Sequence, residues 1–192
     1  MVTRRAVVKI ILLAISAIVT FFLFDKWRQI ISKPNLSLLH KKKSLIAEVA
    51  EAIIPRTDTP GAKDVGVEEF IINMIKFCSD RKTQNNFITG LLDLENYTIN
   101  EYGSSFLSCD SSGRSAILTY FESKAYYQIN IFNKVRNRLM GKPFIIKFKE
   151  LTVEGYCTSE LGATRGLAYD YIPVAYDACI PLEPNQRSWA TK

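Results

Sequence analysis

Apolar residues recur three and four positions apart in three successive stretches of the chain. This spacing predicts amphipathic helices over residues 38–54, 65–79 and 83–102. Pro55 ends the first helix because proline cannot continue one, and Gly103 follows the third as its expected C-cap. The second stretch has the most regular apolar stripe, formed by Val67, Phe70, Ile71, Met74, Ile75 and Cys78.

Two later segments, 124–139 and 142–162, are ambiguous. Their β-branched and aromatic residues favour strands, but their apolar positions repeat with a period near 3.6, so we expect helices in both. A further helix is expected after Gly103 and before residue 124. It should start near Asp110, Ser111 and Ser112, whose side chains are good N-caps.

The pattern changes after Gly162, where Tyr, Pro and Gly are frequent and no period is usable, so an irregular tail is expected. The prediction is therefore an all-α fold, with a small helical domain over 38–182 and a flexible C-terminus over 183–192. The tail aromatics either pack on the domain's own helices or anchor another protein. They are Tyr169, Tyr171, Tyr176 and Trp189.

The first 37 residues form a separate unit, because an unbroken apolar run over 10–24 follows a basic start. Arg4, Arg5 and Lys9 are typical of a twin-arginine export signal, although a chance arginine pair before an ordinary anchor is the alternative. No small-residue cleavage site follows the run. We therefore expect residues 6–24 to stay in the inner membrane as an anchor, with the domain on its periplasmic side.

The net charge of +6 could suggest a nucleic-acid partner, but it is concentrated at the N-terminus. Residues 1–28 hold five basic residues against one acidic residue, which leaves only +2 for the rest. The basic cluster at 40–43 lies close to the predicted membrane and is typical of a solvated face or a contact with anionic headgroups. We predict no nucleic-acid binding.

Cysteine and histidine give little support to a metal or haem site in this chain. The four cysteines have no C-x-x-C spacing, and His40 is the only histidine. An oxidising periplasm permits disulfides, and Cys157 with Cys179 is the pair we expect. Cys78 is as readily interpreted as a buried free thiol on an apolar helix face.

The sequence also lacks a recognisable catalytic arrangement. His40 beside the membrane is no credible base for a nucleophile, and nucleotide-binding glycine motifs are missing. Asp58 and Asp64 flank a proline- and glycine-rich loop, where we expect them to bond backbone amides. The chain is therefore predicted not to be an enzyme by itself and to hold no cofactor.

Three segments together resemble one family. They are "AEAIIPRTDTPGAKDVGVEEFI" (50–71), "FKELTVEGYCTSELGA" (148–163) and "YIPVAYDACIPL" (171–182). They are similar to the gluconate 2-dehydrogenase subunit 3 family, the small subunits of membrane-bound flavin-dependent sugar and polyol dehydrogenases.

The resemblance implies a non-catalytic partner that supports twin-arginine export of a large FAD-dependent subunit of the glucose-methanol-choline type. A cytochrome c subunit with haem c often accompanies the pair. Two other hypotheses stay open: a freestanding periplasmic enzyme with a site around Asp58, Asp64 and Glu160, and an anchored interaction protein. The candidate partner-binding residues are Pro55, Thr57, Asp58, Pro60, Gly61, Tyr156, Ser159, Glu160, Tyr171, Pro173 and Tyr176.

Overall fold

The fold is known from a computed structural model, which describes most of the chain beyond residue 32. The described residues are 13–17, 20, 21, 24, 28, 32–125, 133, 134, 136–138, 141–172, 179, 181 and 184–190.

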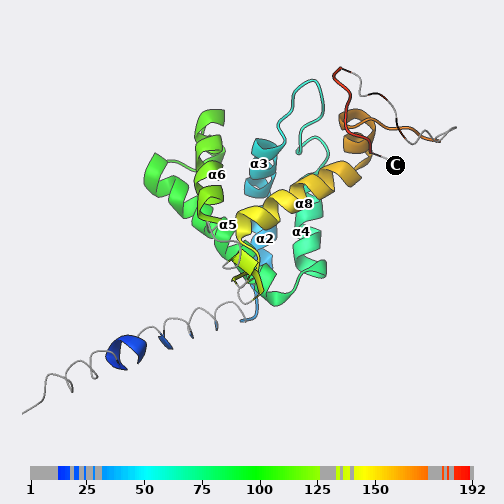
Figure 1. The fold of residues 1–192 in the computed structure, drawn as a ribbon. Coiled ribbons are helices and arrows are strands. Elements are labelled where there is room, and N and C mark those ends of the chain that lie inside the picture. Colours follow the sequence, from blue (N-terminus) through cyan, green and yellow to red (C-terminus); the bar gives the residue numbers. More distant parts are fainter. Residues whose placement is uncertain are drawn as a thin grey trace, which may run out of the picture.

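The described chain is all-α, as the sequence predicts (Figure 1). Its main helices are α2 (Ser37–Lys41), α3 (Lys43–Ile53), α4 (Val67–Cys78), α5 (Arg81–Tyr102), α6 (Ser111–Ala125) and α8 (Phe144–Thr158). A 3₁₀ turn, η1 (Phe106–Ser108), lies between α5 and α6, and a π-helical turn, η2 (Gly162–Gly166), follows α8.

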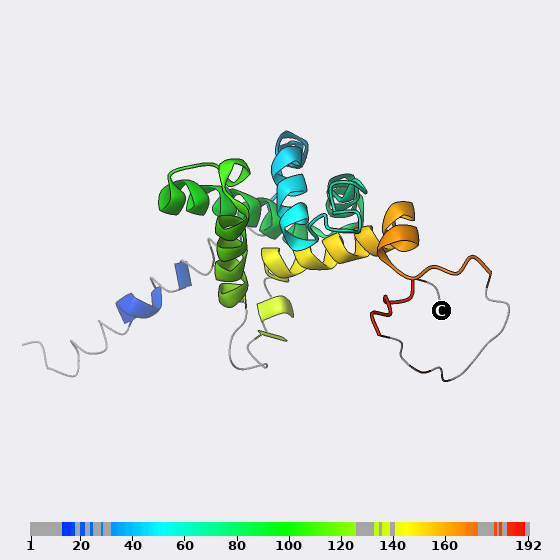
Figure 2. The same ribbon diagram turned by 90° about the horizontal axis from the view of Figure 1, so that it is seen from above.

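Helix α8 is the element around which the others pack. It contacts α3, α4, α5, α6 and η2, and Figure 2 shows it spanning the body from the α5–α6 side to η2. Phe148 and Leu151 in its middle are fully buried. The period of 3.6 therefore outweighs the strand propensity of this segment, because burial of one continuous helical face favours the helix.

The contact between α5 and α8 is unusually close. A Cβ atom on Gly90 would lie 2.2 Å from the Cβ atom of Phe144. The rings of Phe87 and Phe148 stack with centroids 5.5 Å apart, and Phe144 meets Phe87 edge-on at 5.3 Å. This aromatic cluster forms because a glycine at position 90 lets the two backbones approach.

Capping residues explain where the helices begin and end. Asp80 accepts a hydrogen bond from the amide of Thr83 at the start of α5, and Gly103 ends that helix with a φ of 65°. Asp110 accepts from the amide of Gly113 at the start of α6, as predicted. The helix predicted over 38–54 is instead interrupted at Lys42, between α2 and α3.

Two sequence predictions extend into residues that the structure does not describe. Within the segment 124–139, residues 124 and 125 belong to α6, and 133, 134 and 136–138 are helical. Arg4, Arg5 and Lys9 lie outside the described residues, as does most of the expected anchor. Residues 13–17, 20, 21 and 24 are helical and lie apart from the helical body in Figures 1 and 2. Within the described part of the chain, no helix combines the length and apolarity that a membrane crossing requires.

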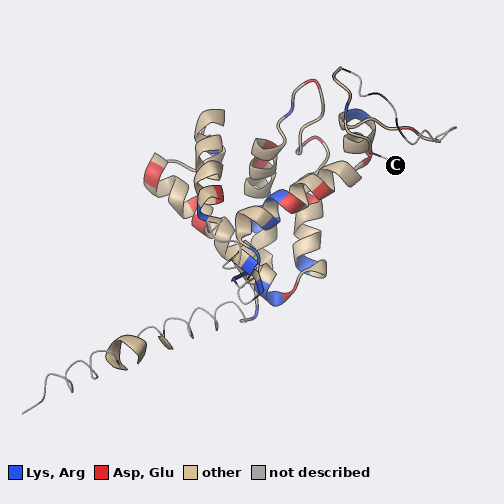
Figure 3. Ribbon diagram, in the orientation of Figure 1, with Lys and Arg blue, Asp and Glu red and all other residues tan. Residues whose placement is uncertain are grey.

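Charged residues are interspersed over the described helices, with both signs on the same elements (Figure 3). Several form ion pairs between helices, such as Lys42 with Glu95, 2.5 Å apart, and Lys149 with Glu122, also 2.5 Å apart. The body of the protein therefore presents a mixed surface.

We predict that Gly90→Ala destabilises the fold despite the higher helix propensity of alanine. The new methyl group would overlap Phe144. Overpacking of this kind costs about 1–3 kcal/mol, whereas the propensity gain is about 1 kcal/mol. The clash is with a Cβ atom, which no rotamer change can move away, so we take the upper end of the overpacking range. We expect a net loss of about 2 kcal/mol in urea denaturation of the full chain in mild detergent. Asn96→Ala, an exposed site in the same helix, is the control, and an equal effect there would contradict the prediction.

Candidate functional site

The loop between α3 and α4, residues 54–66, has an irregular path that two carboxylates hold in place. Glu51 accepts hydrogen bonds from the amides of Arg56 and Lys63, each 2.9 Å long. Asp64 accepts from the amide of Gly61, also at 2.9 Å. A Cβ on Gly61 would lie 2.4 Å from the Glu51 carboxylate, so only glycine fits there. The expectation that Asp64 bonds a loop amide is confirmed.

The C-terminal end of α8 meets this loop across a separation of 96 residues. The hydroxyl of Tyr156 donates a 2.8 Å hydrogen bond to the carbonyl oxygen of Pro60. Turn η2 then folds back over the same tyrosine. A Cβ on Gly166 would lie 2.3 Å from the Tyr156 hydroxyl, and one on Gly162 would lie 2.0 Å from the Tyr156 carbonyl oxygen. Ser159 accepts a hydrogen bond from the amide of Gly162 at 3.0 Å, which fixes the entry to the turn.

The loop and η2 together enclose a cleft of about 290 Å³. The cleft has a mixed character, with two basic and two acidic side chains, hydroxyl groups and one leucine. The residues that line it are Arg56, Thr57, Asp58, Thr59, Pro60, Asp64, Leu161 and Arg165.

The charged side chains of the cleft differ in the ion pairs and hydrogen bonds that they make. Arg56 lies 3.5 Å from Asp64 but its side chain is 72% exposed, so this pair is weak. Asp58 accepts from the hydroxyl of Thr57 at 3.0 Å and lies 4.0 Å from Arg187. The guanidinium of Arg165 has neither an ion pair nor a hydrogen bond within the described residues. Positive charge is therefore the charge that the cleft leaves available.

A second carboxylate network attaches the back of the loop to α6. Glu48 on α3 lies 2.6 Å from the Lys63 ammonium and 2.5 Å from the Arg114 guanidinium. Arg114 also donates to the carbonyl of Leu107 at 2.8 Å. The hydrogen bond from Lys63 holds the pKa of Glu48 below its ordinary value of 4.5; burial opposes this shift and the hydrogen bond from Arg114 adds to it.

The C-terminal segment returns to the cleft. Ala168 pairs with Trp189 in an isolated bridge, and Arg187 donates a 2.6 Å hydrogen bond to the carbonyl of Arg165. Tyr171 is 81% exposed. Tyr169 and Trp189 are also exposed, which favours anchoring over internal packing for these three aromatics.

The structure brings together most of the predicted partner-binding residues. Pro55, Thr57, Asp58, Pro60 and Gly61 lie in the loop. Tyr156 and Ser159 join it to η2, whereas Glu160 is exposed and does not line the cleft. Pro173 and Tyr176 lie outside the described residues.

Sequence reasoning missed the other cleft residues, above all Arg56, Leu161 and Arg165. Leu161 and Arg165 are four positions apart, the spacing that places two side chains on one face of a helix. That spacing was a usable signal. The tail was expected to be irregular directly after Gly162, however, and η2 carries the helical path on to Gly166.

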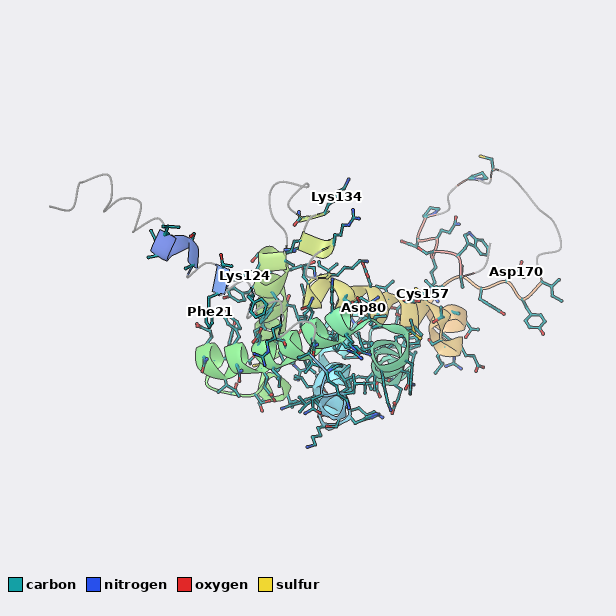
Figure 4. The ribbon with its side chains drawn as sticks, turned by 90° about the horizontal axis from the view of Figure 1, so that it is seen from below. Phe21, Asp80, Lys124, Lys134, Cys157 and Asp170 are labelled. Carbon is teal, nitrogen blue, oxygen red and sulfur yellow. The ribbon has the colours of Figure 1, made fainter. Side chains whose placement is uncertain are left out.

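The cysteine predictions need correction. All four cysteines lie in described residues and are free thiols, so the structure contradicts the expected disulfide between Cys157 and Cys179. Cys157 is half-buried against the core at the end of α8 (Figure 4), whereas Cys179 is exposed. Cys78 is exposed rather than buried, because it lies in the last turn of α4, beyond the buried Ile75.

No group of three or more histidine, cysteine, aspartate or glutamate side chains suited to a metal ion occurs within the described residues. The cleft, at about 290 Å³, is at the lower limit of pockets that hold drug-sized ligands. It can enclose one side chain or a small anion, and a whole flavin dinucleotide exceeds it.

A family model described as gluconate 2-dehydrogenase subunit 3 matches residues 40–174. The match includes α3, the loop, α8 and η2, and therefore every residue that lines the cleft. No curated protein and no solved structure matches the chain.

We predict that Glu48→Gln destabilises the fold at neutral pH by about 1.5 kcal/mol or more, since it removes a charged acceptor shared by two cations. The folded-state pKa of Glu48 is lowered, so its contribution is present above the unfolded-state pKa and is lost as the pH falls through the folded-state value, below 4.5. Denaturation of both proteins from pH 7 to pH 3.5 should show this difference shrinking.

The control for this pH series is Glu154→Gln, which alters an exposed glutamate on α8. Its stability difference from the unaltered chain should stay small throughout the series. A Glu48→Gln difference that is independent of pH would contradict the role given to the ionised carboxylate.

Proposed function

The chain belongs to the gluconate 2-dehydrogenase subunit 3 family, and we propose that it is a non-catalytic auxiliary subunit of a periplasmic dehydrogenase complex. In this complex a large flavoprotein of the glucose-methanol-choline type binds FAD and oxidises a sugar or polyol. The present chain supports twin-arginine export of the flavoprotein and stabilises it after export. A cytochrome c subunit with haem c is the third member.

The proposal rests mainly on one observation. Two segments within the residues that the family model matches, the α3–α4 loop and the end of α8, come together at one surface. The loop and the end of α8 are far apart in the sequence, yet the hydrogen bond between Tyr156 and Pro60 joins them at the rim of a cleft. Exposed aromatics of the tail, including Tyr171 and Trp189, lie in the adjoining segment. Aromatic anchors beside a polar rim are typical of surfaces that bind another protein.

The composition of the cleft supports a binding role over a catalytic one. Asp58 and Asp64 both line it, but Asp64 is engaged with the Gly61 amide and Glu160 lies elsewhere. A freestanding site built on these three carboxylates would need them to converge on one substrate. The arrangement therefore favours the auxiliary subunit.

The N-terminal sequence supports the proposed location. Arg4, Arg5 and Lys9 precede the apolar run that ends at Phe24, the order of a twin-arginine signal. In our proposal residues 6–24 anchor the chain in the inner membrane and the helical domain faces the periplasm. The twin-arginine translocase is then the first partner of the chain, and the flavoprotein crosses the membrane with it.

Co-purification tests the proposal. An affinity-tagged full chain, extracted from its native membranes with mild detergent, should bring down a yellow protein whose absorbance shows bound FAD. The tagged chain without that partner should show no sugar oxidation with an artificial electron acceptor. Sustained turnover by the isolated chain would refute the auxiliary role.

A double change of Arg4 and Arg5 to Lys should block export of both subunits, because the twin-arginine route requires the arginine pair. We expect most dehydrogenase activity to move from the membrane fraction to the cytoplasmic fraction. Arg28→Lys, an equally conservative change after the apolar run, should leave the distribution normal. Normal export of the flavoprotein in the Arg4 and Arg5 variant would contradict the escort function.

A further inference from the structure

Arg165 has an unusual combination of position and pairing for a surface arginine. It is carried by η2, whose two glycines fit closely against Tyr156, so its backbone is held against the end of α8. Its carbonyl is bonded to Arg187, while its guanidinium lines the cleft without an ion pair or hydrogen bond in the described part of the chain. A guanidinium presents five donors in a planar fork that suits a carboxylate.

The lining holds two arginines and two aspartates, and both aspartates have an arginine partner. Arg56 lies 3.5 Å from Asp64 and Arg187 lies 4.0 Å from Asp58, which leaves Arg165 without a counter-charge among the described residues. Asp64 is further occupied by the Gly61 amide. Because Arg56 makes only one long contact to Asp64 from an exposed position, it can turn towards a new anion at little cost.

The remaining lining indicates an amphipathic occupant. Leu161 is 39% exposed although it is a large apolar residue, and it precedes Arg165 by one helical turn. Thr57 and Thr59 of the loop add hydroxyl groups to the lining. The lining thus combines apolar, hydrogen-bonding and cationic groups, within a volume of about 290 Å³. That volume suits one acidic side chain, or a chain terminus, with its apolar neighbour.

We propose that this cleft receives a carboxylate of the flavoprotein subunit, bound by Arg165 and assisted by Arg56, and that this contact fixes how the two subunits dock. The inference rests on the proposed function, since it requires a flavoprotein partner. It adds the chemistry of the contact: the partner presents an aspartate, a glutamate or its C-terminal carboxylate beside an apolar residue that packs on Leu161.

The first test compares the affinities of three full-length chains for the flavoprotein, measured in mild detergent at low salt. Arg165→Glu replaces attraction with repulsion and should weaken binding about 30-fold or more, as expected when one member of a desolvated charge pair is lost. Raising the salt concentration should weaken the unaltered complex and narrow this difference.

Arg81→Glu is the matched control, because it makes the same charge change at an exposed site. The 12 residues of α4 separate Arg81 from the loop, a length of about 18 Å. This variant should bind normally. Since position 165 is exposed, Arg165→Glu should keep the circular dichroism and melting temperature of the unaltered chain.

The second test uses Arg165→Lys, which introduces a primary amine at the same place. A water-soluble carbodiimide should join this amine to the partner carboxylate as an amide, and mass spectrometry of the cross-linked peptide would identify the acidic residue. The unaltered guanidinium does not form this amide, so the cross-link at position 165 should be absent from the unaltered complex.

The outcomes separate this inference from the proposed function. If the unaltered chain binds no flavoprotein, the proposed function fails. If it binds and Arg165→Glu binds equally well, or Arg81→Glu weakens binding as much, only the carboxylate contact is overturned. Binding of free gluconate to the subunit alone, lost in Arg165→Glu, would also overturn the docking role, because the cleft would then be a small-molecule site.

Discussion

The loop between α3 and α4 lies outside any regular hydrogen-bond ladder, so its backbone amides need partners of their own. Glu51 and Asp64 supply three of them, from positions just before and within the loop. The carbonyl of Pro60 is satisfied from the other side by Tyr156. One hydrogen bond contributes only about 0.5–1.5 kcal/mol, so the shape of the loop depends on the set rather than on a single bond. The shape of the cleft follows from this arrangement.

The ion pairs on this surface differ in how much they stabilise the fold. Glu48 is only 19% exposed and bonds both Lys63 and Arg114, so its charge is needed to compensate two cations that are partly withdrawn from water. Arg56 and Asp64 are a single 3.5 Å contact between side chains that reach solvent. The first network therefore holds the loop to α3 and α6, while the second pair leaves its arginine free to change partner. In our proposal, stability and recognition are therefore assigned to different residues of one loop.

Local rules predicted most of the helices, because each of α4, α5 and α8 has one continuous apolar face. Asp110 caps the start of α6 and Gly103 caps the end of α5, as the sequence predicted. The break at Lys42, the exposure of Cys78 and the separation of Cys157 from Cys179 depend on which helices pack together, which no local window contains. Most of the cleft likewise depends on tertiary packing and could not be predicted from a local stretch of sequence. The loop half was evident from its prolines, glycines and aspartates, but Arg165 acquires its place only when η2 folds over Tyr156.

A subunit that escorts a folded partner needs both a rigid contact to set orientation and a larger surface to hold it. In our proposal the cleft meets the first need, since hydrogen bonds to Glu51 and Asp64 and from Tyr156 hold the loop in place. A charged contact of this kind contributes more to specificity than to affinity, because the attraction is offset by desolvation. Affinity then has to come from apolar burial, and Tyr171, Ile172 and Trp189 expose suitable side chains in the adjoining segment. In our proposal Arg187, which bonds the Arg165 carbonyl and lies 4.0 Å from Asp58, keeps nearby Trp189 beside the cleft, so that a partner engaging this aromatic also meets Arg165.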